Sequence, residues 1–289
     1  MHVFTTNRDL LDYLNAFRLA GSTIGFVPTM GAIHTGHQAL VRRCAAECDV
    51  TCASIFVNPT QFNDSQDLSK YPRPLANDIH LLNESGADLL YLPRGVEVYP
   101  PDFEGVSLEL GELGKVMEGP FRPGHFAGVV TVVHRLLDIV QPDRLYMGLK
   151  DYQQQTIIRY MLKQLEMPVE LVPCEIVREE DGLAFSSRNV RIDPALRSKA
   201  PLIYQTLQAA REMLEASNAA EVRRWATDAL DDAGFRTEYF QLCDGITLQP
   251  VKDQREHDLI VACVASWLGE VRLIDNLVLK GSLNKVPGS

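Results

Sequence analysis

Two histidines that lie three positions apart, His34 and His37, are the side chains of this sequence best suited to binding a phosphate. They follow an apolar run at residues 23–27, which is typical of a short buried strand and is ended by the breakers Pro28 and Gly31. From His37 onward apolar residues recur at helical spacing. A helix N-terminus has unpaired N–H groups and the positive end of the helix dipole. The sequence therefore predicts a phosphate site between this strand and this helix.

Imidazoles at this spacing share one side of a helical turn, and Gly36 between them would let an anion approach the backbone. Because imidazole titrates near neutral pH, we expect the pair to donate hydrogen bonds to a phosphate as it gains charge. The common role of any single histidine is in the core or on the surface. A zinc site is disfavoured because no third ligand and no His-Glu-x-x-His motif is present.

Polar side chains also follow the next predicted strand, at residues 50–57, where open α/β sheets bind their ligands. Gln61 is predicted to contact a ligand, whereas Asn58 is either a turn former or a ligand contact. Arg122 and His125 stand just before a strongly apolar helix. They either contact a ligand or cap that helix at the surface.

Lys150 and Asp151 come directly after a predicted strand at residues 144–147. They offer a cation for phosphate and a carboxylate for ribose hydroxyls or a magnesium shell. A surface ion pair is the alternative, and the histidines favour a role in binding.

Ser186, Ser187 and Arg188 bring two hydroxyl donors and a guanidinium into three consecutive positions of a predicted loop. Such a loop suits a clamp that closes over the β- and γ-phosphates of a bound nucleotide.

The composition is that of an ordinary globular protein, with 46% apolar and 23% charged residues. A net charge of −10 disfavours a broad nucleic-acid surface but allows a locally basic cleft for a small anion. The six cysteines lack C-x-x-C spacing and are expected to be buried thiols of a cytoplasmic protein. No signal peptide and no membrane span are expected.

With 289 residues, two domains are expected, with a boundary near Val177 that gives domains 1–176 and 177–289. The order of predicted elements in the first indicates an α/β fold with a parallel sheet and helices on both faces. That in the second indicates a smaller α+β unit. Expected helices cover residues 7–18, 75–84, 129–140, 152–165, 194–216 and 219–233. Expected strands after residues 23–27 and 50–57 are 87–92, 106–110, 144–147, 169–172, 175–178, 237–242, 259–266 and 271–277.

Taken together, these pieces closely resemble the pantoate–beta-alanine ligases, a family of the His-x-Gly-His nucleotidyltransferase group. The resemblance covers nearly the whole chain, and several motifs in one order carry it. They are residues 28–37 (PTMGAIHTGH), 55–62 (IFVNPTQF), 71–73 (YPR), 122–126 (RPGHF), 148–154 (GLKDYQQ) and 181–189 (DGLAFSSRN).

The resemblance implies ATP-dependent condensation of pantoate with beta-alanine through an enzyme-bound pantoyl-adenylate, with release of pyrophosphate and AMP. It also implies a Rossmann-like ATP- and pantoate-binding domain, a C-terminal lid, Mg²⁺ and a homodimer. His37 would be the catalytic acid, aided by His34, Lys150, Ser186, Ser187 and Arg188. The ATP-binding site would be lined by Met30, Gly31, Ala32, Ile33, His34, Thr35, Gly36, His37, Gly148, Leu149, Lys150, Asp151, Val177, Phe185, Ser186, Ser187 and Arg188. Pantoate would be held by Gln61, Gln154, Asn58, Arg122 and His125, with Gln61 also reaching beta-alanine, and Asp78 is our candidate metal ligand.

Three positions depart from the family pattern. Leu149 stands where Glu is usual, Phe185 where Met is usual, and Thr35 where Glu is common. We expect altered ATP affinity rather than lost activity from these changes. Two rival functions are another nucleotidyltransferase that stops after releasing pyrophosphate and a catalytically silent nucleotide-binding protein.

Overall fold

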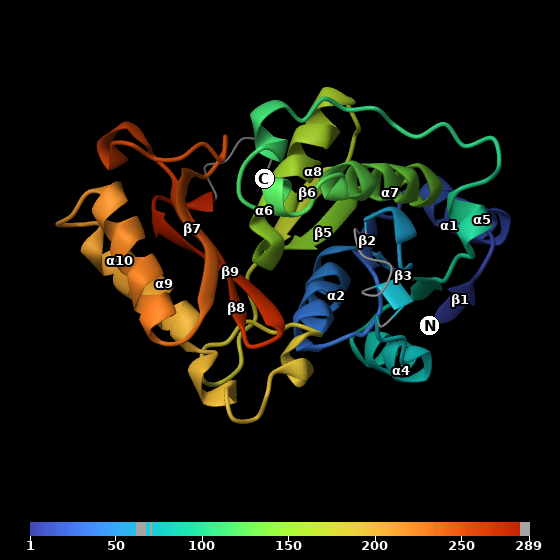
Figure 1. Cartoon of the computed structure of the whole chain (residues 1–289). Helices are drawn as coiled ribbons and strands as arrows, with labels where there is room; N and C mark the ends of the chain where they lie inside the picture. The colour runs from blue at the N-terminus through green and yellow to red at the C-terminus, as the bar shows by residue number, and fades with distance from the viewer. Residues whose placement is uncertain (62–67, 70, 284–289) are drawn as a thin grey trace.

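The computed structural model of the chain describes residues 1–61, 68–69 and 71–283. Figure 1 shows two units side by side, a larger one built on a parallel sheet and a smaller one at the C-terminal end of the chain. Phe62, the last residue of one motif quoted above, lies outside the described residues.

The larger sheet has six strands in the order β1-β4-β3-β2-β5-β6, and all neighbouring strands run parallel. These strands are β1 (His2–Phe4), β2 (Ile24–Thr29), β3 (Val50–Ile55), β4 (Leu89–Tyr91), β5 (Arg144–Gly148) and β6 (Glu170–Cys174). The central strands β2 and β3 are apolar and almost continuously buried, as expected where helices cover both faces of a parallel sheet.

Successive residues of a strand point to opposite faces, and this alternation assigns the helices to the two faces of the sheet. The helices are α1 (Asn7–Leu19), α2 (Thr35–Glu47), α4 (Leu75–Glu84), α5 (Gly95–Val98), α6 (Glu118–Phe121), α7 (His125–Val140) and α8 (Tyr152–Gln164). Phe26 belongs to a core cluster with residues of α1, α7 and α8, whereas Val27 belongs to a cluster with residues of α2 and α4. The fold class predicted for this part of the chain is confirmed.

The strand order reverses at β2, and this reversal fixes where a ligand can bind. From β2 the chain adds β3 and β4 on one side, and it later adds β5 and β6 on the other. Loops that leave β2 and β5 therefore turn to opposite faces and open a crevice at their carboxyl ends. The His34–His37 pair follows β2, and Lys150 follows β5, so the topology brings both to this crevice.

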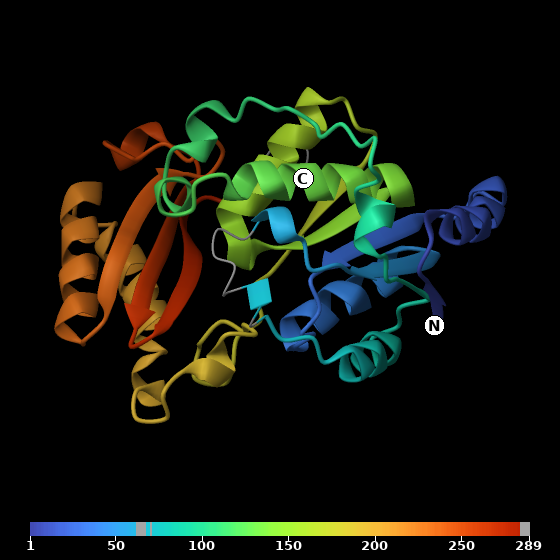
Figure 2. The same cartoon turned by 45° about the vertical axis from the view of Figure 1, so that its right-hand side comes forward.

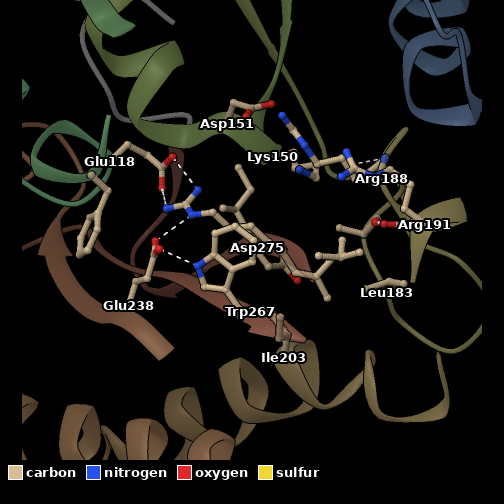
Figure 3. A pocket seen from close by; sticks show the side chains of 18 of the residues that line it. Glu118, Lys150, Asp151, Leu183, Arg188, Arg191, Ile203, Glu238, Trp267 and Asp275 are labelled. Atoms are coloured by element: carbon tan, nitrogen blue, oxygen red, sulfur yellow. Dashed lines mark hydrogen bonds and ion pairs between the residues drawn. The ribbon is translucent and has the colours of Figure 1, made fainter. Parts of the chain in front are cut away.

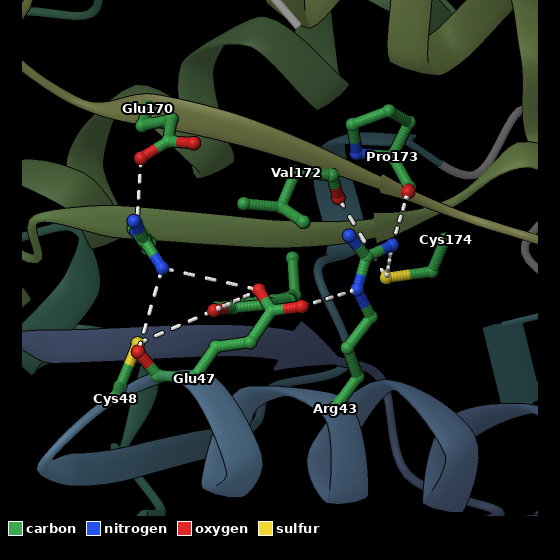
Figure 4. A network of polar contacts seen from close by, with 9 residues as sticks. Arg43, Glu47, Cys48, Glu170, Val172, Pro173 and Cys174 are labelled. Atoms are coloured by element: carbon green, nitrogen blue, oxygen red, sulfur yellow. Dashed lines mark hydrogen bonds and ion pairs between the residues drawn. The ribbon is translucent and has the colours of Figure 1, made fainter. Parts of the chain in front are cut away.

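A polar network holds the C-terminal half of α2 on β5 and β6 (Figure 4). Arg43 donates to the carbonyl of Pro173 at 2.7 Å and to Glu47 at 2.9 Å, and Glu47 accepts from the Tyr146 hydroxyl at 3.0 Å. On the neighbouring strand Arg144 pairs with Glu170 at 2.9 Å. Because α2 is rigid, fixing this end also fixes the position of the histidines at its start.

The smaller unit has its own core beneath a three-stranded antiparallel sheet, in the order β7-β8-β9. Its elements are α9 (Leu202–Met213), α10 (Ala219–Asp232), β7 (Arg236–Asp244), β8 (Ile260–Leu268) and β9 (Val271–Lys280). Figure 2 shows the two helices on one side of this sheet, with the other side turned to the larger unit. The predicted α+β character of this region is confirmed.

The two units meet through a small apolar cluster that joins Leu149 and Tyr152 of the larger unit to Cys243, Leu259 and Val261 of the smaller one. Two short 3₁₀ helices carry residues of the crevice, η1 (Pro59–Gln61) and η3 (Leu149–Asp151). The others are η2 (Gly111–Gly114), η4 (Asn189–Arg191), η5 (Arg197–Lys199) and η6 (Gln254–Glu256).

Several element boundaries differ from the predictions. Residues 106–110 are not a strand, because this alternating segment packs Val106, Leu108 and Leu110 on the core without pairing to another strand. Residues 175–178 leave the sheet and contribute only one isolated bridge, from Arg178 to Ala184. The helix expected at 194–216 begins at residue 202, after a 3₁₀ turn.

Two further differences touch the site. Strand β2 continues through Pro28. The proline is tolerated because β5 pairs with β2 only at Gly25 and Phe26, so no strand on that side needs an N–H from residue 28. Helix α7 begins at His125 and not at 129, since Gly124 adopts a left-handed conformation (φ 79°) that allows the chain to enter the helix there.

Candidate functional site

A cavity of about 260 Å³ lies at the carboxyl ends of β2 and β5, as the strand order requires. It gathers most of the residues predicted from sequence, namely Met30, His34, Gly36, His37, Asn58, Gln61, Arg122, His125, Gly148, Lys150, Asp151, Gln154, Val177, Phe185, Ser186, Ser187 and Arg188. Gly31, Ala32, Ile33, Thr35, Leu149 and Asp78 do not line it. The chain thus brings distant segments together around one space that a small ligand can fill.

The histidine pair forms the first turn of α2. His34 is the N-cap residue, and its Nδ1 accepts a hydrogen bond from the Gly36 N–H at 3.1 Å. His37 Nδ1 accepts from the His34 N–H at 3.4 Å, and the two ring centroids are 4.0 Å apart. Because both Nδ1 atoms accept, the proton of each neutral ring is on Nε2. Each ring therefore offers an Nε2–H donor.

Both histidines stay neutral at physiological pH. Burial, followed by the charge of Lys150, lowers the pKa of His34 to about 4. Burial, followed by the neighbouring His34 and Lys150, lowers the pKa of His37 to about 3. The expectation that the pair gains charge near neutral pH is therefore wrong for the free protein, since burial makes the imidazolium costly. The N–H of Gly36 is used by His34, but Gly36 lines the cavity, and the approach of an anion at this position stays a prediction.

Asp78 of α4 holds the turn that leads to α2. This residue is 1% exposed. Its two carboxylate oxygens accept from the N–H groups of Ala32 (2.9 Å) and Ile33 (2.7 Å). Gly31 has φ 81°, and a Cβ there would lie 2.9 Å from the carboxylate. Asp78 thus shapes the turn before the histidines, and its role as a metal ligand stays a prediction.

Gln61 reaches the cavity from η1, which lies directly on α7. A Cβ on Gly128 would be 2.5 Å from the carbonyl oxygen of Thr60, so only glycine allows this close contact. The Asn58 side chain donates to Gln61 and to the Gly128 carbonyl, and its oxygen accepts from the Thr60 N–H and from Tyr99. Asn58 is therefore a turn former that also orients Gln61. A direct ligand contact by Asn58 stays a prediction.

His125 and Arg122 both line the cavity, and neither side chain caps α7. His125 Nδ1 donates to the carbonyl of Gln61 at 2.9 Å, so its Nε2 is an acceptor. Burial and the nearby Arg122 lower the pKa of His125 to about 4. Arg122 lies 3.8 Å from Glu118, and burial lowers its pKa as well. Of the two roles left open by the sequence, ligand contact is the one that fits these positions.

The loop of residues 185–188 lines the cavity and begins beside the histidines. The ring of Phe185 is stacked on His34, with centroids 6.4 Å apart and planes 16° apart. The hydroxyl of Ser186 accepts from the Arg188 N–H at 3.3 Å, and both residues line the cavity. A face of the cavity thus carries the two serines and Arg188, as the sequence predicts for a phosphate clamp.

A second cavity, of about 420 Å³, adjoins the first and extends under the C-terminal sheet (Figure 3). Arg122, Lys150, Asp151, Ser186 and Arg188 line both cavities. The two spaces therefore form one continuous cleft between the units.

A partly buried ion network at the far wall of the second cavity was not predicted from the sequence. Arg272 donates to both oxygens of Glu118 (2.9 and 2.7 Å) and to Glu238 (2.7 Å), which also accepts from Trp267. Burial acts to raise the pKa of Glu118, but the hydrogen bonds from Arg272 lower it below its usual range. These residues are far apart in the sequence, so no local pattern indicates them.

Tyr71 also lines the first cavity and was not assigned a role. Burial raises the pKa of its hydroxyl, which keeps it a neutral donor. The signal that could have found it is its place in the YPR motif at residues 71–73.

The fold and the site together define an α/β nucleotide-binding enzyme, with a His-x-Gly-His phosphate site at the switch point of its sheet. The comparisons with known proteins agree. The model of the family described as Pantoate-beta-alanine ligase matches residues 2–278, and the chain belongs to this family.

Similar proteins cover nearly the same length. A pantothenate synthetase of Bacteroides thetaiotaomicron is 48% identical over 97% of this chain and 99% of its own, and one of Agrobacterium fabrum is 44% identical over 96% of each. The crystal structure of pantothenate synthetase from Thermus thermophilus superposes with a TM-score of 0.89 at 44% identity, covering 97% of this chain and all of its own. That of the pantoate-beta-alanine ligase from Francisella tularensis, complexed with beta-gamma ATP and beta-alanine, has a TM-score of 0.78 at 34% identity and covers 96% and 98%.

None of the described helices has the length and apolar character needed to cross a membrane.

Proposed function

We propose that this protein condenses (R)-pantoate with beta-alanine to pantothenate at the expense of ATP, through a pantoyl-adenylate intermediate. The observation that carries the proposal is the pair of Nε2–H donors at the start of α2. His34 and His37 line the same switch-point crevice as Lys150, in a chain that belongs to this ligase family. The product places the enzyme in pantothenate and coenzyme A biosynthesis.

In the first step the pantoate carboxylate attacks the α-phosphorus of ATP, and the bond to the leaving pyrophosphate breaks. The substrate supplies its own nucleophile, so the protein needs no serine or cysteine for this role. Catalysis then consists of alignment and of stabilising charge on the phosphoryl oxygens. His34 and His37 donate from Nε2 without a proton having to be gained first, and Lys150 adds a positive charge. Ser186, Ser187 and Arg188 contact the outer phosphates.

Pantoate is placed against η1 and the start of α7. Gln61 and Gln154 are neutral amides that bond its hydroxyls and carboxylate without pairing the nucleophile tightly. Arg122 offers a charged donor, whereas the Nε2 of His125 offers an acceptor for a hydroxyl. Asn58 acts here through the orientation of Gln61.

In the second step the amine of beta-alanine attacks the acyl carbon of the adenylate, the bond to the phosphate oxygen breaks, and AMP leaves. The amine loses a proton to solvent as the amide forms. Gln61, at the border of the pantoate pocket, also contacts beta-alanine in this proposal. The Francisella tularensis ligase was crystallised in complex with beta-alanine, which supports a site for this substrate in the present chain.

ATP is expected to enter with Mg²⁺, and the residues present fit this mode of binding. The described residues contain no cluster of three or more His, Cys, Asp or Glu side chains that would form a closed metal site. Magnesium is usually held by one or two carboxylates together with substrate phosphates, and the exposed carboxylate of Asp151 lines the cavity. When bound, the ion would neutralise phosphate charge.

We also propose that residues 177–289 act as a lid over residues 1–176. The continuous cleft between the two units supports this role, because its walls belong to both. From the family alone, we also propose that the protein is a homodimer and that it is located in the cytoplasm.

Omission of single substrates tests the function. With ATP, pantoate and beta-alanine present, pyrophosphate and AMP should form together with pantothenate. Without beta-alanine, pyrophosphate should form in an amount limited to the enzyme sites, and AMP release should stop. Continued AMP release without beta-alanine would indicate another nucleotidyltransferase, and absence of pyrophosphate under all conditions would indicate a silent nucleotide-binding protein.

A further inference from the structure

Asn276 of β9 reaches from the smaller unit to the segment that carries Lys150. Its side-chain amide donates to the carbonyl oxygen of Leu149 at 2.8 Å and to that of Lys150 at 2.9 Å. Asn276 is 5% exposed. One side chain of the C-terminal sheet therefore uses both of its N–H donors on two consecutive carbonyls of η3.

The position of Asn276 is itself fixed by a buried ion pair. Its N–H donates to Asp275 at 2.8 Å, and Asp275 accepts from both terminal nitrogens of Arg178 at 2.6 and 3.0 Å. The side chain of Asp275 is 3% exposed, and the Arg178 guanidinium lies 3.7 Å from the ring centroid of Tyr204. Figure 3 shows Asp275 at the border of the cavity that Lys150 and Asp151 also line.

These contacts restrict the backbone of η3. The direction of a side chain follows from the φ and ψ angles of its own residue, so holding the carbonyls of Leu149 and Lys150 narrows the directions that the lysine can take. Leu149 is buried in the cluster between the units, which holds the same turn by packing. The other end of the network, Arg178, lies seven positions before Phe185 and so belongs to the segment that leads into the phosphate clamp.

We propose that Asn276 is a positioning residue for Lys150, and that the adenylation step depends on its two contacts with the carbonyls of η3. This inference rests on the proposed function, in which Lys150 contacts the phosphates of ATP. The two contacts of Asn276 are specific to an amide, because each of them requires an N–H donor. Aspartate has the same shape but offers only acceptors to the two carbonyls, and leucine offers neither.

The test compares three variants of the full-length protein in the first half-reaction, measured as pyrophosphate release from ATP and pantoate. Asn276→Leu and Asn276→Asp should lower the rate constant at least about tenfold while the KM for pantoate stays within about twofold. Tyr152→Phe is the matched control, since it removes another buried bond between the units, from the Tyr152 hydroxyl to the Gly245 carbonyl at 2.7 Å, without touching the carbonyls of η3. It should lower the melting temperature but leave the rate within about twofold.

A double-mutant cycle with Lys150→Ala separates positioning from a general loss of structure. If Asn276 acts through Lys150, Asn276→Leu should cost less than about twofold in the Lys150→Ala background, although it costs tenfold or so alone. Asn276→Gln, which keeps both amide donors on a side chain one methylene longer, should recover part of the rate. Equal losses in both backgrounds would overturn this inference and leave the proposed function intact. A wild-type rate for Lys150→Ala would instead overturn the phosphate role of Lys150, and this inference with it.

Discussion

At the scale of single residues, the site depends on neutral imidazoles that are oriented before ATP arrives. The backbone N–H groups of His34 and Gly36 occupy the two Nδ1 atoms, so each ring is fixed as an Nε2–H donor. A donor that is held in place needs little reorganisation when charge develops on the phosphate. Their lowered pKa values are thus compatible with a role in catalysis, because no protonated imidazole is required.

His37→Ala tests this role directly. Since the lost donor acts on the transition state, turnover should fall about 100-fold or more, whereas ATP affinity should stay within about tenfold. Steady-state kinetics and equilibrium binding of ATP measure the two quantities separately. A loss of binding that matches the loss of turnover would show that His37 serves ground-state binding only.

Most of the predicted site residues line the cavity, and they could be predicted because they lie in short motifs next to predicted strand ends. It did not indicate protonation states. Whether His34 is charged depends on how deeply the folded chain buries it and on Lys150, which is more than a hundred positions away. Asn276 and the Glu118–Arg272 pair were missed for the same reason, since their partners come from other elements.

At the scale of elements, two tight contacts position the site, one below the β2–α2 turn and one between η1 and α7. Asp78 holds the first through the N–H groups of Ala32 and Ile33. Gly128 permits the second. Both are made by residues outside the reacting centre, and each gives a variant with a separate kinetic signature.

Asp78→Asn should distinguish shaping of the turn from metal binding. In this variant an NH₂ group replaces one carboxylate oxygen, so two donors face each other at one backbone N–H of the turn. The free energy of unfolding should fall by about 1–3 kcal/mol, and the KM for ATP should rise. The Mg²⁺ concentration for half-maximal rate should stay unchanged. Asp143→Asn, which disturbs the contact to the Ile24 N–H at the other end of β2, is the control and should spare ATP affinity. A large shift in the Mg²⁺ requirement of Asp78→Asn would instead assign it to the metal.

Gly128→Ala should displace η1, because its Cβ would collide with the Thr60 carbonyl. We expect a rise in the KM for pantoate, in the same direction as for Gln61→Ala, and a stability loss of about 1–3 kcal/mol. Gly95→Ala is the control, since a Cβ there meets nothing within 4 Å. An unchanged pantoate KM in both Gly128→Ala and Gln61→Ala would remove Gln61 from the pantoate pocket.

Helices α1 and α4 were predicted closely, whereas the starts of α7 and α9 and the short irregular segments were not. Helix α4 has the predicted bounds, and the alternation of Phe26 and Val27 between two cores follows from a strand covered on both faces. Residues 106–110 show the limit of such patterns. Their alternation is real, but it reflects packing on the core in a segment that has no partner strand.

At the scale of the whole molecule, the neutral histidines should make stability depend on pH. Their folded pKa values, about 4 for His34 and about 3 for His37, lie below the ordinary value of 6.5. The unfolded chain therefore binds protons first, so this part of the stability is present above pH 6.5 and is lost as pH falls toward 4 and below.

Urea unfolding at about pH 7 and about pH 5 measures this effect. The free energy of unfolding should decrease on acidification, and the decrease should be smaller in the double variant His34→Gln, His37→Gln. All other titrating groups are common to both proteins, so the difference isolates the pair. Identical pH dependence in the two proteins would mean that the histidines titrate alike in the folded and unfolded states.

The arrangement of the two units was the part of the molecule least accessible from sequence. Composition indicates a second unit, but the contacts that seat it, such as Tyr152 on Gly245 and Asn276 on η3, join residues more than ninety positions apart. The strand order shows why the site lies at β2 and β5. Which face of the C-terminal sheet is turned toward it follows only from the folded chain.

A crystal structure with a non-hydrolysable ATP analogue and pantoate is the most direct test of the central claim. We predict that the Nε2 atoms of His34 and His37 lie within about 2.7–3.2 Å of phosphate oxygens, with the pantoate carboxylate in line behind the α-phosphorus and against Gln61. A triphosphate that contacts neither imidazole, and lies instead beside Arg191 and Arg272 in the larger cavity, would contradict it.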